Sequence, residues 1–182
     1  WANKFIPSIL EAWFPNHLGG KAIAETLFGD YNPGGKLSVT FPKTIGQIEL
    51  NFPFKPGSQA GQHQEGPNGY GKTRVNGALY PFGYGLSYTT FKYENLKITP
   101  TSQKTKGDFK ITADITNTGK RSGDEIVQLY IRDKVSSVIT YDSQLRGFER
   151  VNLKPGETKK VEFTLHPEDL MILDKNMNWT VE

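Results

Sequence analysis

The most informative stretch of this sequence lies near its middle and reads Leu79-Tyr80-Pro81-Phe82-Gly83-Tyr84-Gly85-Leu86-Ser87-Tyr88-Thr89-Thr90-Phe91, with five aromatic residues. Gly83 and Gly85 permit backbone angles and close approaches that a Cβ atom prevents. Pro81 fixes one φ angle and removes a hydrogen-bond donor. Aromatic residues at alternating positions are suited to filling the space between two packed layers. The stretch therefore predicts a junction between two domains.

The residues before this junction have an α/β pattern. Residues 9–14 are a short apolar run typical of a buried strand. Apolar residues at helical spacing over 18–27, followed by Gly29, predict a helix and its end. Alternation over 37–41 predicts a second strand. One such unit cannot cover both faces of its strands, so we expect the rest of the sheet to lie upstream of Trp1.

Residues 42–78 are rich in Gly, Pro, Asn and Gln, with turn signals at 55–59 and 65–69. A loop of this length is uncommon inside a compact domain. Two interpretations are open: a solvated connection, or a loop that makes a functional contact.

The residues after the junction have an all-β pattern. Apolar and polar residues alternate in short runs that are separated by turn signals. The expected strands are 91–98 with a break, 109–115, 127–131, 145–153, 161–165 and one that begins at 179. Short strands at this spacing predict an antiparallel β-sandwich. The predicted fold class is thus an α/β remnant followed by an all-β sandwich.

Composition excludes several classes of function. The chain has 182 residues, a formal net charge of +3 and no cysteine. It has no basic run and no nucleic-acid-binding motif, so nucleic acid is not expected as a partner. No apolar stretch is long enough to span a bilayer. No nucleotide-binding or nucleophile-elbow motif is present, and the three histidines are far apart in sequence. We expect no metal and no cofactor.

Few residues are candidates for chemistry. The carboxylate pairs Asp124-Glu125 and Glu168-Asp169 flank predicted strands, and we interpret them as solvated. Ligands of open α/β sheets bind beyond the carboxyl ends of strands. Asn16 and His17 lie at such an end and are candidates for a substrate rim, although Asn16 is also placed to cap the following helix. Arg74 in the long loop is a further rim candidate, with an ordinary surface position as the alternative.

The motifs together resemble family 3 glycoside hydrolases, the β-glucosidase-like enzymes, over essentially the whole chain. Residues 9–30 resemble the end of the family's α/β sandwich domain, and residues 32–42 resemble the signature that follows it. Residues 79–91 resemble its domain linker. Residues 117–157 resemble the fibronectin type III-like domain that closes many of these enzymes. The chain departs from the family at 16–18, where Asn-His-Leu stands in place of the usual Gly-Gln-Glu.

The resemblance implies a retaining, exo-acting hydrolase that removes terminal β-linked sugars. Its aspartate nucleophile and glutamate acid/base lie upstream in the family, and neither motif occurs here, so we transfer no catalytic residue to this chain. The implied partner is an oligosaccharide or glycoside bound by upstream catalytic domains, on which this part packs. The resemblance also suggests a periplasmic or secreted location.

The expected domains are the end of an α/β domain (1–45), a long loop with the aromatic linker (46–87) and a fibronectin type III-like sandwich without its last strand (88–182). Two alternatives remain open. The first is a stand-alone, non-catalytic module that binds carbohydrate or protein. The second is a transporter- or adhesion-type structural domain, which would not need the α/β segment of residues 8–41. A sugar-binding face requires exposed aromatic residues. Trp179 and Tyr141 are the candidates, and the alternation places Trp179 in the core.

Overall fold

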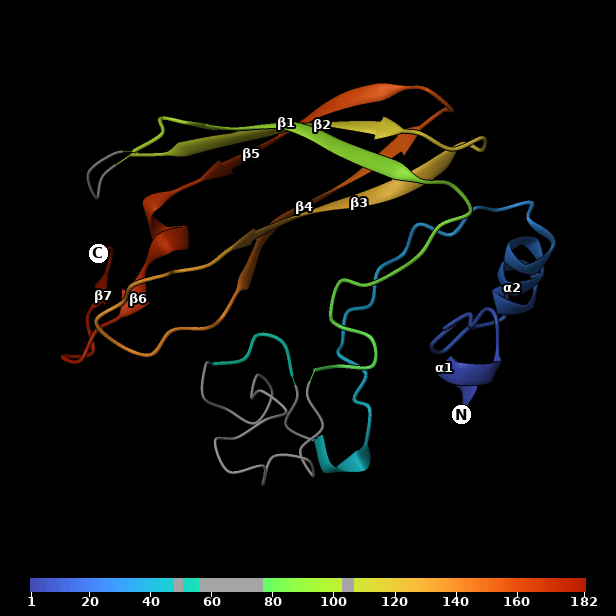
Figure 1. Ribbon diagram of the computed structural model, residues 1–182, viewed down its shortest axis with the longest axis horizontal. Helices are drawn as coiled ribbons and strands as arrows, with labels where there is room; N and C mark the ends of the chain where they lie inside the picture. Colours follow the sequence, from blue (N-terminus) through green and yellow to red (C-terminus); the bar gives the residue numbers. More distant parts are fainter. Residues whose placement is uncertain (48–50, 56–76, 103–106) are drawn as a thin grey trace.

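The computed structural model describes residues 1–47, 51–55, 77–102 and 107–182 (Figure 1). Its helices are α1 (Ala2–Phe5), α2 (Gly19–Phe28) and the 3-10 turns η1 (Ile45–Gln47) and η4 (Pro167–Leu170). Its strands are β1 (Phe91–Thr99), β2 (Phe109–Asn117), β3 (Gly123–Ile131), β4 (Gln144–Leu153), β5 (Thr158–Leu165), β6 (Ile172–Leu173) and β7 (Trp179–Thr180). No helix among the described residues has the length and apolar character needed to cross a membrane.

The strands form a sandwich of two antiparallel sheets, and this part of the predicted fold is confirmed. One sheet has the order β1-β2-β5 and the other pairs β3 with β4. Alternate residues of each strand point inward. The core is the cluster Ile115, Val127, Val151, Leu153 and Val161. Burying each such side chain contributes roughly 1.5–3 kcal/mol, so this cluster is the main source of stability in the sandwich.

Strand β1 contains the predicted break. Its register against β2 shifts between Glu94 and Lys97, and Asn95 adopts a positive φ of 54°. This is a β-bulge, which bends an edge strand and blunts it. Tyr93 and Ile98 pair with the buried Ile115 and Ile111 and therefore point inward.

The inner face of β1 is incompletely covered. Tyr93 and Ile98 are 48% and 47% exposed despite facing inward. Strand β4 lies over β5, where the ring of Phe163 fills the space beside Gly147. Strand β3 approaches β1 through the hydrogen bond between Tyr93 and Glu125, and among the described strands it pairs with β4 alone.

Two strand predictions before the junction are wrong. Residues 9–14 have no strand structure, and Ile9 and Leu10 are exposed. Residues 37–41 contribute one bridge, between Phe41 and Tyr80. A strand forms only where a neighbouring segment satisfies its backbone groups in a regular ladder. None of the described segments pairs with residues 9–14 in this way, and residues 37–41 exchange only a few backbone bonds with residues 79–84. The predicted helix is confirmed as α2, which ends at Gly29 in the left-handed conformation with φ 84°.

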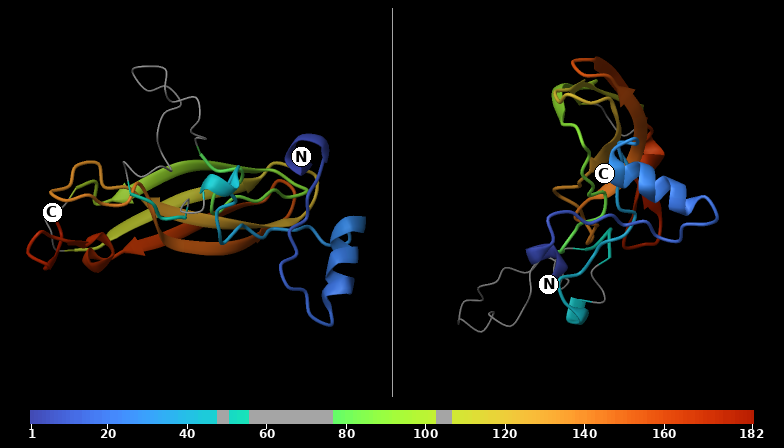
Figure 2. Two further views of the ribbon diagram at one scale, coloured as in Figure 1. Left: turned by 90° about the horizontal axis from the view of Figure 1, so that it is seen from below. Right: turned by 90° about the vertical axis from the view of Figure 1, so that its right-hand side faces the viewer.

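Residues 29–41, which we call the tail, run beside residues 79–90, which we call the linker. Leu37 donates its N–H to the Tyr84 carbonyl at 2.8 Å, and Gly83 donates to the Leu37 carbonyl at 2.7 Å. Phe41 donates to the Tyr80 carbonyl at 2.8 Å. Figure 1 shows the two segments descending side by side from the sandwich on the side of β3. Figure 2 shows α2 beside one end of the sandwich and the C-terminus at the other.

Candidate functional site

The predicted rim residues are not brought together with other functional groups. Asn16 and His17 lie in an exposed turn before α2. The Asn16 side chain accepts a hydrogen bond from Leu18 N–H at 3.2 Å. Leu18 directly precedes α2 and makes no side-chain capping bond, so the Asn16 side chain bonds the turn that leads into the helix. Arg74 lies outside the described residues.

Histidine and carboxylate groups form no metal site in the part of the chain that the structure describes. His166 instead pairs with Asp108, with Nδ1 and Oδ1 2.9 Å apart. The hydrogen bond and the charge of Asp108 raise the pKa of His166. Asp169 accepts a bond from the His166 N–H and so stabilises the first turn of η4.

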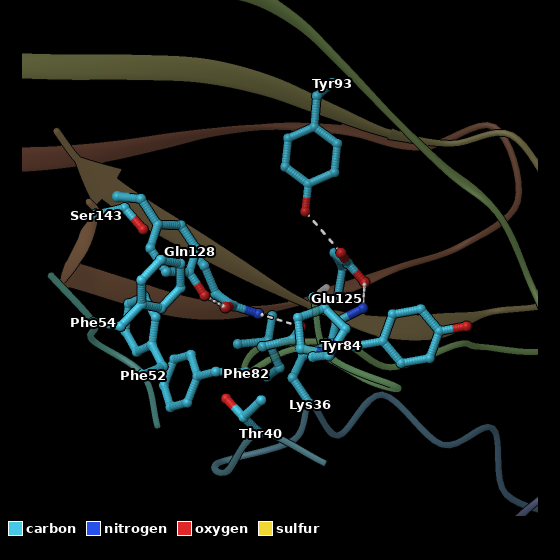
Figure 3. Close-up of a pocket in the computed structure, with 16 residues that line it drawn as sticks. Lys36, Thr40, Phe52, Phe54, Phe82, Tyr84, Tyr93, Glu125, Gln128 and Ser143 are labelled. Carbon is cyan, nitrogen blue, oxygen red and sulfur yellow. Dashed lines mark hydrogen bonds and ion pairs between the residues drawn. The ribbon is translucent and has the colours of Figure 1, made fainter. Parts of the chain in front are cut away.

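The prediction that Asp124-Glu125 is a solvated pair is wrong for Glu125, which is only 7% exposed. Its carboxylate lies 3.1 Å from Lys36 Nζ and accepts a hydrogen bond from the Tyr93 hydroxyl at 2.7 Å. Burial, followed by the hydrogen bond and charge of Glu125, holds the pKa of Tyr93 far above its ordinary value. The three side chains join the tail, β1 and β3 (Figure 3).

Lys36 also explains one glycine of the linker. Its Nζ donates to the Gly85 carbonyl at 2.9 Å. A Cβ at Gly85 would lie 2.4 Å from the Gly35 carbonyl oxygen, too close for a non-bonded contact. At Gly83, φ is 78° and a Cβ would collide with the Gln128 side chain. Both glycines are therefore required for the linker to approach the tail and β3.

Asn32 is the second polar centre of the contact. Its Oδ1 accepts from Tyr88 N–H at 2.8 Å and from the Ser87 hydroxyl at 2.9 Å. Its Nδ2 donates to the Ser122 carbonyl at 2.9 Å, just before β3. One amide group therefore uses both its oxygen and its nitrogen to join tail, linker and sandwich.

Asn117 performs the same role inside the sandwich, where it is fully buried. Its Oδ1 accepts from the Thr89 hydroxyl at 2.7 Å and from Gly119 N–H at 3.0 Å. Its Nδ2 donates to the carbonyls of Arg121 and Leu153 at 2.7 and 2.9 Å. Buried polar groups that are fully bonded define a single arrangement of their neighbours.

Further bonds extend the contact to the end of α2. The Tyr88 hydroxyl donates to the Thr26 carbonyl at 2.8 Å, and Arg121 donates to the Gly29 carbonyl at 3.2 Å. Arg150 pairs with Asp124 and also donates to the Tyr31 hydroxyl at 2.9 Å. We call this whole set of contacts between tail, linker and sandwich the joint.

The joint is a structural arrangement, since its buried carboxylate is neutralised by Lys36 and bonded by Tyr93. Glu125 was detectable in the sequence: it shares the parity of Gly123, Val127 and Leu129 in a strand of period two, so it had to point inward. Asn32 and Lys36 gave no comparable signal, because their partners are distant in sequence.

Trp179 does not lie in the core. It is 68% exposed, so the prediction from the alternation is wrong. Strands β6 and β7 form only a two-residue pair, and so short a pair has no second layer to cover its ring. Tyr141 is partly exposed, and Lys55 lies 5.5 Å over its ring. The two aromatic residues form no ring pair with each other.

Comparison with known proteins identifies both parts of the chain. Residues 1–88 match the glycosyl hydrolase family 3 C-terminal domain, and residues 125–182 match the fibronectin type III-like domain. The chain is 46% identical over 180 residues to a beta-xylosidase of Formosa agariphila, covering 97% of this chain and 24% of that protein. It is 40% identical to the periplasmic beta-glucosidase of Salmonella typhimurium, covering 96% and 23%.

Solved structures give the same result. A beta-glucosidase from Listeria innocua in complex with glucose superposes with a TM-score of 0.82 at 31% identity, covering 94% of this chain and 24% of that one. A b-glucosidase from Erythrobacter marinus gives a TM-score of 0.78 at 39% identity, covering 90% and 21%. The chain thus spans about a quarter of the length of the proteins it matches.

Proposed function

The chain belongs to glycosyl hydrolase family 3, and from that premise we propose that it is the structural C-terminal part of a retaining, exo-acting β-glucosidase-like enzyme. The parent protein removes terminal β-linked sugars from oligosaccharides, and its catalytic residues lie outside residues 1–182. The role of this part is to hold the fibronectin type III-like sandwich against the domain that carries out catalysis. Asn16, His17 and Arg74 remain our candidates for a contact with the substrate rim.

The observation that supports this role is the contrast between the two sides of the tail. Towards the sandwich, the tail is held by the ion pair of Lys36 with the buried Glu125 and by the hydrogen bonds of Asn32. Away from it, the segment before Gly29 exposes large apolar side chains, including Phe14 at 98% and Phe28 at 85%. Helix α2 buries only Gly19 and Thr26. Elements with an apolar face need another layer to cover it. Large apolar side chains that are exposed together in this way mark an interface.

We therefore assign residues 1–45 to the end of an α/β domain whose other elements cover α2. Residues 46–87 are the loop and linker, and residues 88–182 are the sandwich. The sparse cover over β1 and the free edge of β3 support a sandwich that takes one further strand. A stand-alone binding module is the second candidate, favoured only by the exposure of Trp179. Such a module would gain nothing from the polar bonds that fix the tail.

The test compares the parent protein with the purified 182-residue chain on aryl β-glucosides and aryl β-xylosides. We expect turnover by the parent and none by the chain. Turnover by the pure chain that a single substitution within it abolishes would contradict the proposal. A parent protein without glycosidase activity, combined with saccharide binding to an exposed Trp179, would favour the binding module.

A further inference from the structure

The joint surrounds a hollow of about 660 Å³. Residues of β3, the tail, the linker and residues 52–54 line it, together with Tyr93 of β1 (Figure 3). Small-molecule sites in proteins are usually roughly 300–1,000 Å³. The hollow therefore has the size needed for a monosaccharide or disaccharide.

One wall of the hollow is aromatic. The rings of Phe52 and Phe82 are stacked with centroids 4.4 Å apart, and Tyr130 meets Phe52 edge-on at 5.7 Å. Figure 3 shows Phe52 and Phe54 on one side of the hollow and Thr40 below it. Aromatic rings offer flat, apolar and rigid surfaces. Such surfaces suit the C–H face of a pyranose ring.

Two hydroxyl groups at the hollow have no assigned role. Thr40 and Ser143 line it, and neither side chain makes a hydrogen bond to any residue that the structure describes. Both residues are partly accessible. Each hydroxyl supplies one donor and two acceptors. Gln128, by contrast, is occupied by Gly83 and Tyr130. The free hydroxyls are therefore the groups available to a ligand.

The charges that line the hollow compensate each other. Among its described lining residues, Lys36 and Glu125 carry charge, and they form an ion pair at 3.1 Å. A phosphate or an ammonium group would find no counter-ion there, because breaking a buried pair leaves a charge unpaired. The ligand that fits is neutral, carries hydroxyl groups and has one apolar face.

We propose that this hollow is a saccharide-binding site for neutral sugars such as glucose or xylose. The Thr40 and Ser143 hydroxyls bond the sugar, and Phe52 and Phe82 pack on its ring. The inference rests on the proposed function only because that function supplies such sugars as products.

The test measures hydrogen exchange of the parent protein with and without glucose. We expect glucose to slow exchange in residues 79–84 and 124–131. Two hydrogen bonds of about 0.7 kcal/mol each correspond to a tenfold change in affinity. The double variant Thr40→Val/Ser143→Ala should therefore raise the half-saturating glucose concentration for these segments about tenfold.

Thr164→Val is the matched control, because Thr164 lies on β5 in the other sheet, and it should change nothing. Glucosamine, whose ammonium group has no partner in the hollow, should give no protection. No slowing in these segments at any glucose concentration up to its solubility limit would overturn the inference, as would a structure of the parent in which polypeptide fills the hollow.

The same preparations are assayed for aryl glycoside hydrolysis, so the two ideas fail separately. Active enzyme without protection contradicts the sugar site alone. Protection without turnover contradicts the proposed activity alone.

Discussion

The Glu125 carboxylate lies 3.1 Å from the Lys36 ammonium group across the boundary between the tail and the sandwich. Both side chains are largely removed from solvent, and they come from segments almost ninety residues apart in sequence. The pair fixes the position of the tail on the sandwich but adds little to the net free energy of unfolding. The desolvation of two charges offsets much of their attraction. Removing one partner is nevertheless costly, since the other charge remains buried.

Lys36→Met should destabilise the protein by about 2–4 kcal/mol, because Glu125 keeps its charge and loses its cation. Urea unfolding followed by circular dichroism measures the loss. Lys92→Met is the matched control, since Lys92 forms an exposed ion pair with Glu94 and such pairs contribute about 0–1 kcal/mol. Equal effects of the two variants would contradict a special role for Lys36.

Asn117→Ala should cost about 2–4 kcal/mol, because it leaves the buried carbonyls of Arg121 and Leu153 without a donor. The loss appears as a lower melting temperature by calorimetry. Asn178→Ala, at an exposed position without a side-chain hydrogen bond to the described residues, should leave the melting temperature within about 1 °C. A melting temperature for Asn117→Ala near that of wild type would show that water replaces the amide.

Two alanine substitutions at glycine should act with opposite sign. Gly85→Ala places a Cβ against the Gly35 carbonyl and should destabilise the joint by about 2 kcal/mol or more. Gly20→Ala meets nothing within 4 Å in α2 and should stabilise that helix by about 0.5–1 kcal/mol. Protease sensitivity of the linker reports the first change, and helix content reports the second. Destabilisation by both would mean that α2 is packed against a layer at Gly20.

Alkaline pH should destabilise the protein through Tyr93. Its pKa is raised in the folded state, so the unfolded chain loses this proton first. The stabilisation of the folded state by protonated Tyr93 is complete below about pH 10, the ordinary tyrosine pKa. It declines as pH rises from there towards the pKa of Tyr93 in the folded state. Urea unfolding between pH 9 and 11 should show a steeper decline for wild type than for Tyr93→Phe. Identical slopes would mean that Tyr93 ionises freely.

The isolated 182-residue chain should self-associate, because unpaired strand edges beside apolar side chains are templates for aggregation. Ile98→Lys places a charge on the uncovered inner face of β1 and should increase the monomer fraction in analytical ultracentrifugation. Thr112→Lys is the matched control, because Thr112 lies on the outward-facing side of β2. Val127→Lys would not serve, since Val127 is in the core. A monomeric wild-type chain that melts cooperatively would argue against an open edge.

The sandwich could be predicted because the patterns that specify its strands and turns lie within short stretches of sequence. Alternation in β2, β3 and β5 sets which side chains face inward, and turns at 117–119 and 154–157 set the connections. Residues 9–14 and 37–41 failed for the opposite reason: an apolar run has strand propensity, but pairing depends on partners that the sequence of the run does not contain. The joint was predicted as a junction from its rings and glycines, whereas Asn32 and Lys36 depend on long-range contacts that periodicity does not register.

Asn32 bonds the Ser122 carbonyl across ninety residues of chain, and that separation sets an order of events during folding. Loop-closure entropy rises with the length of the loop, so the hairpins of the sandwich have a kinetic advantage over the attachment of the tail. On a ribosome, the tail can bond the linker as soon as residues 79–90 have been made, but its bonds to Ser122 and Glu125 must wait for the start of β3. The joint is therefore completed only after residues 122–125 have been made, which places it after the tail and the linker in biogenesis.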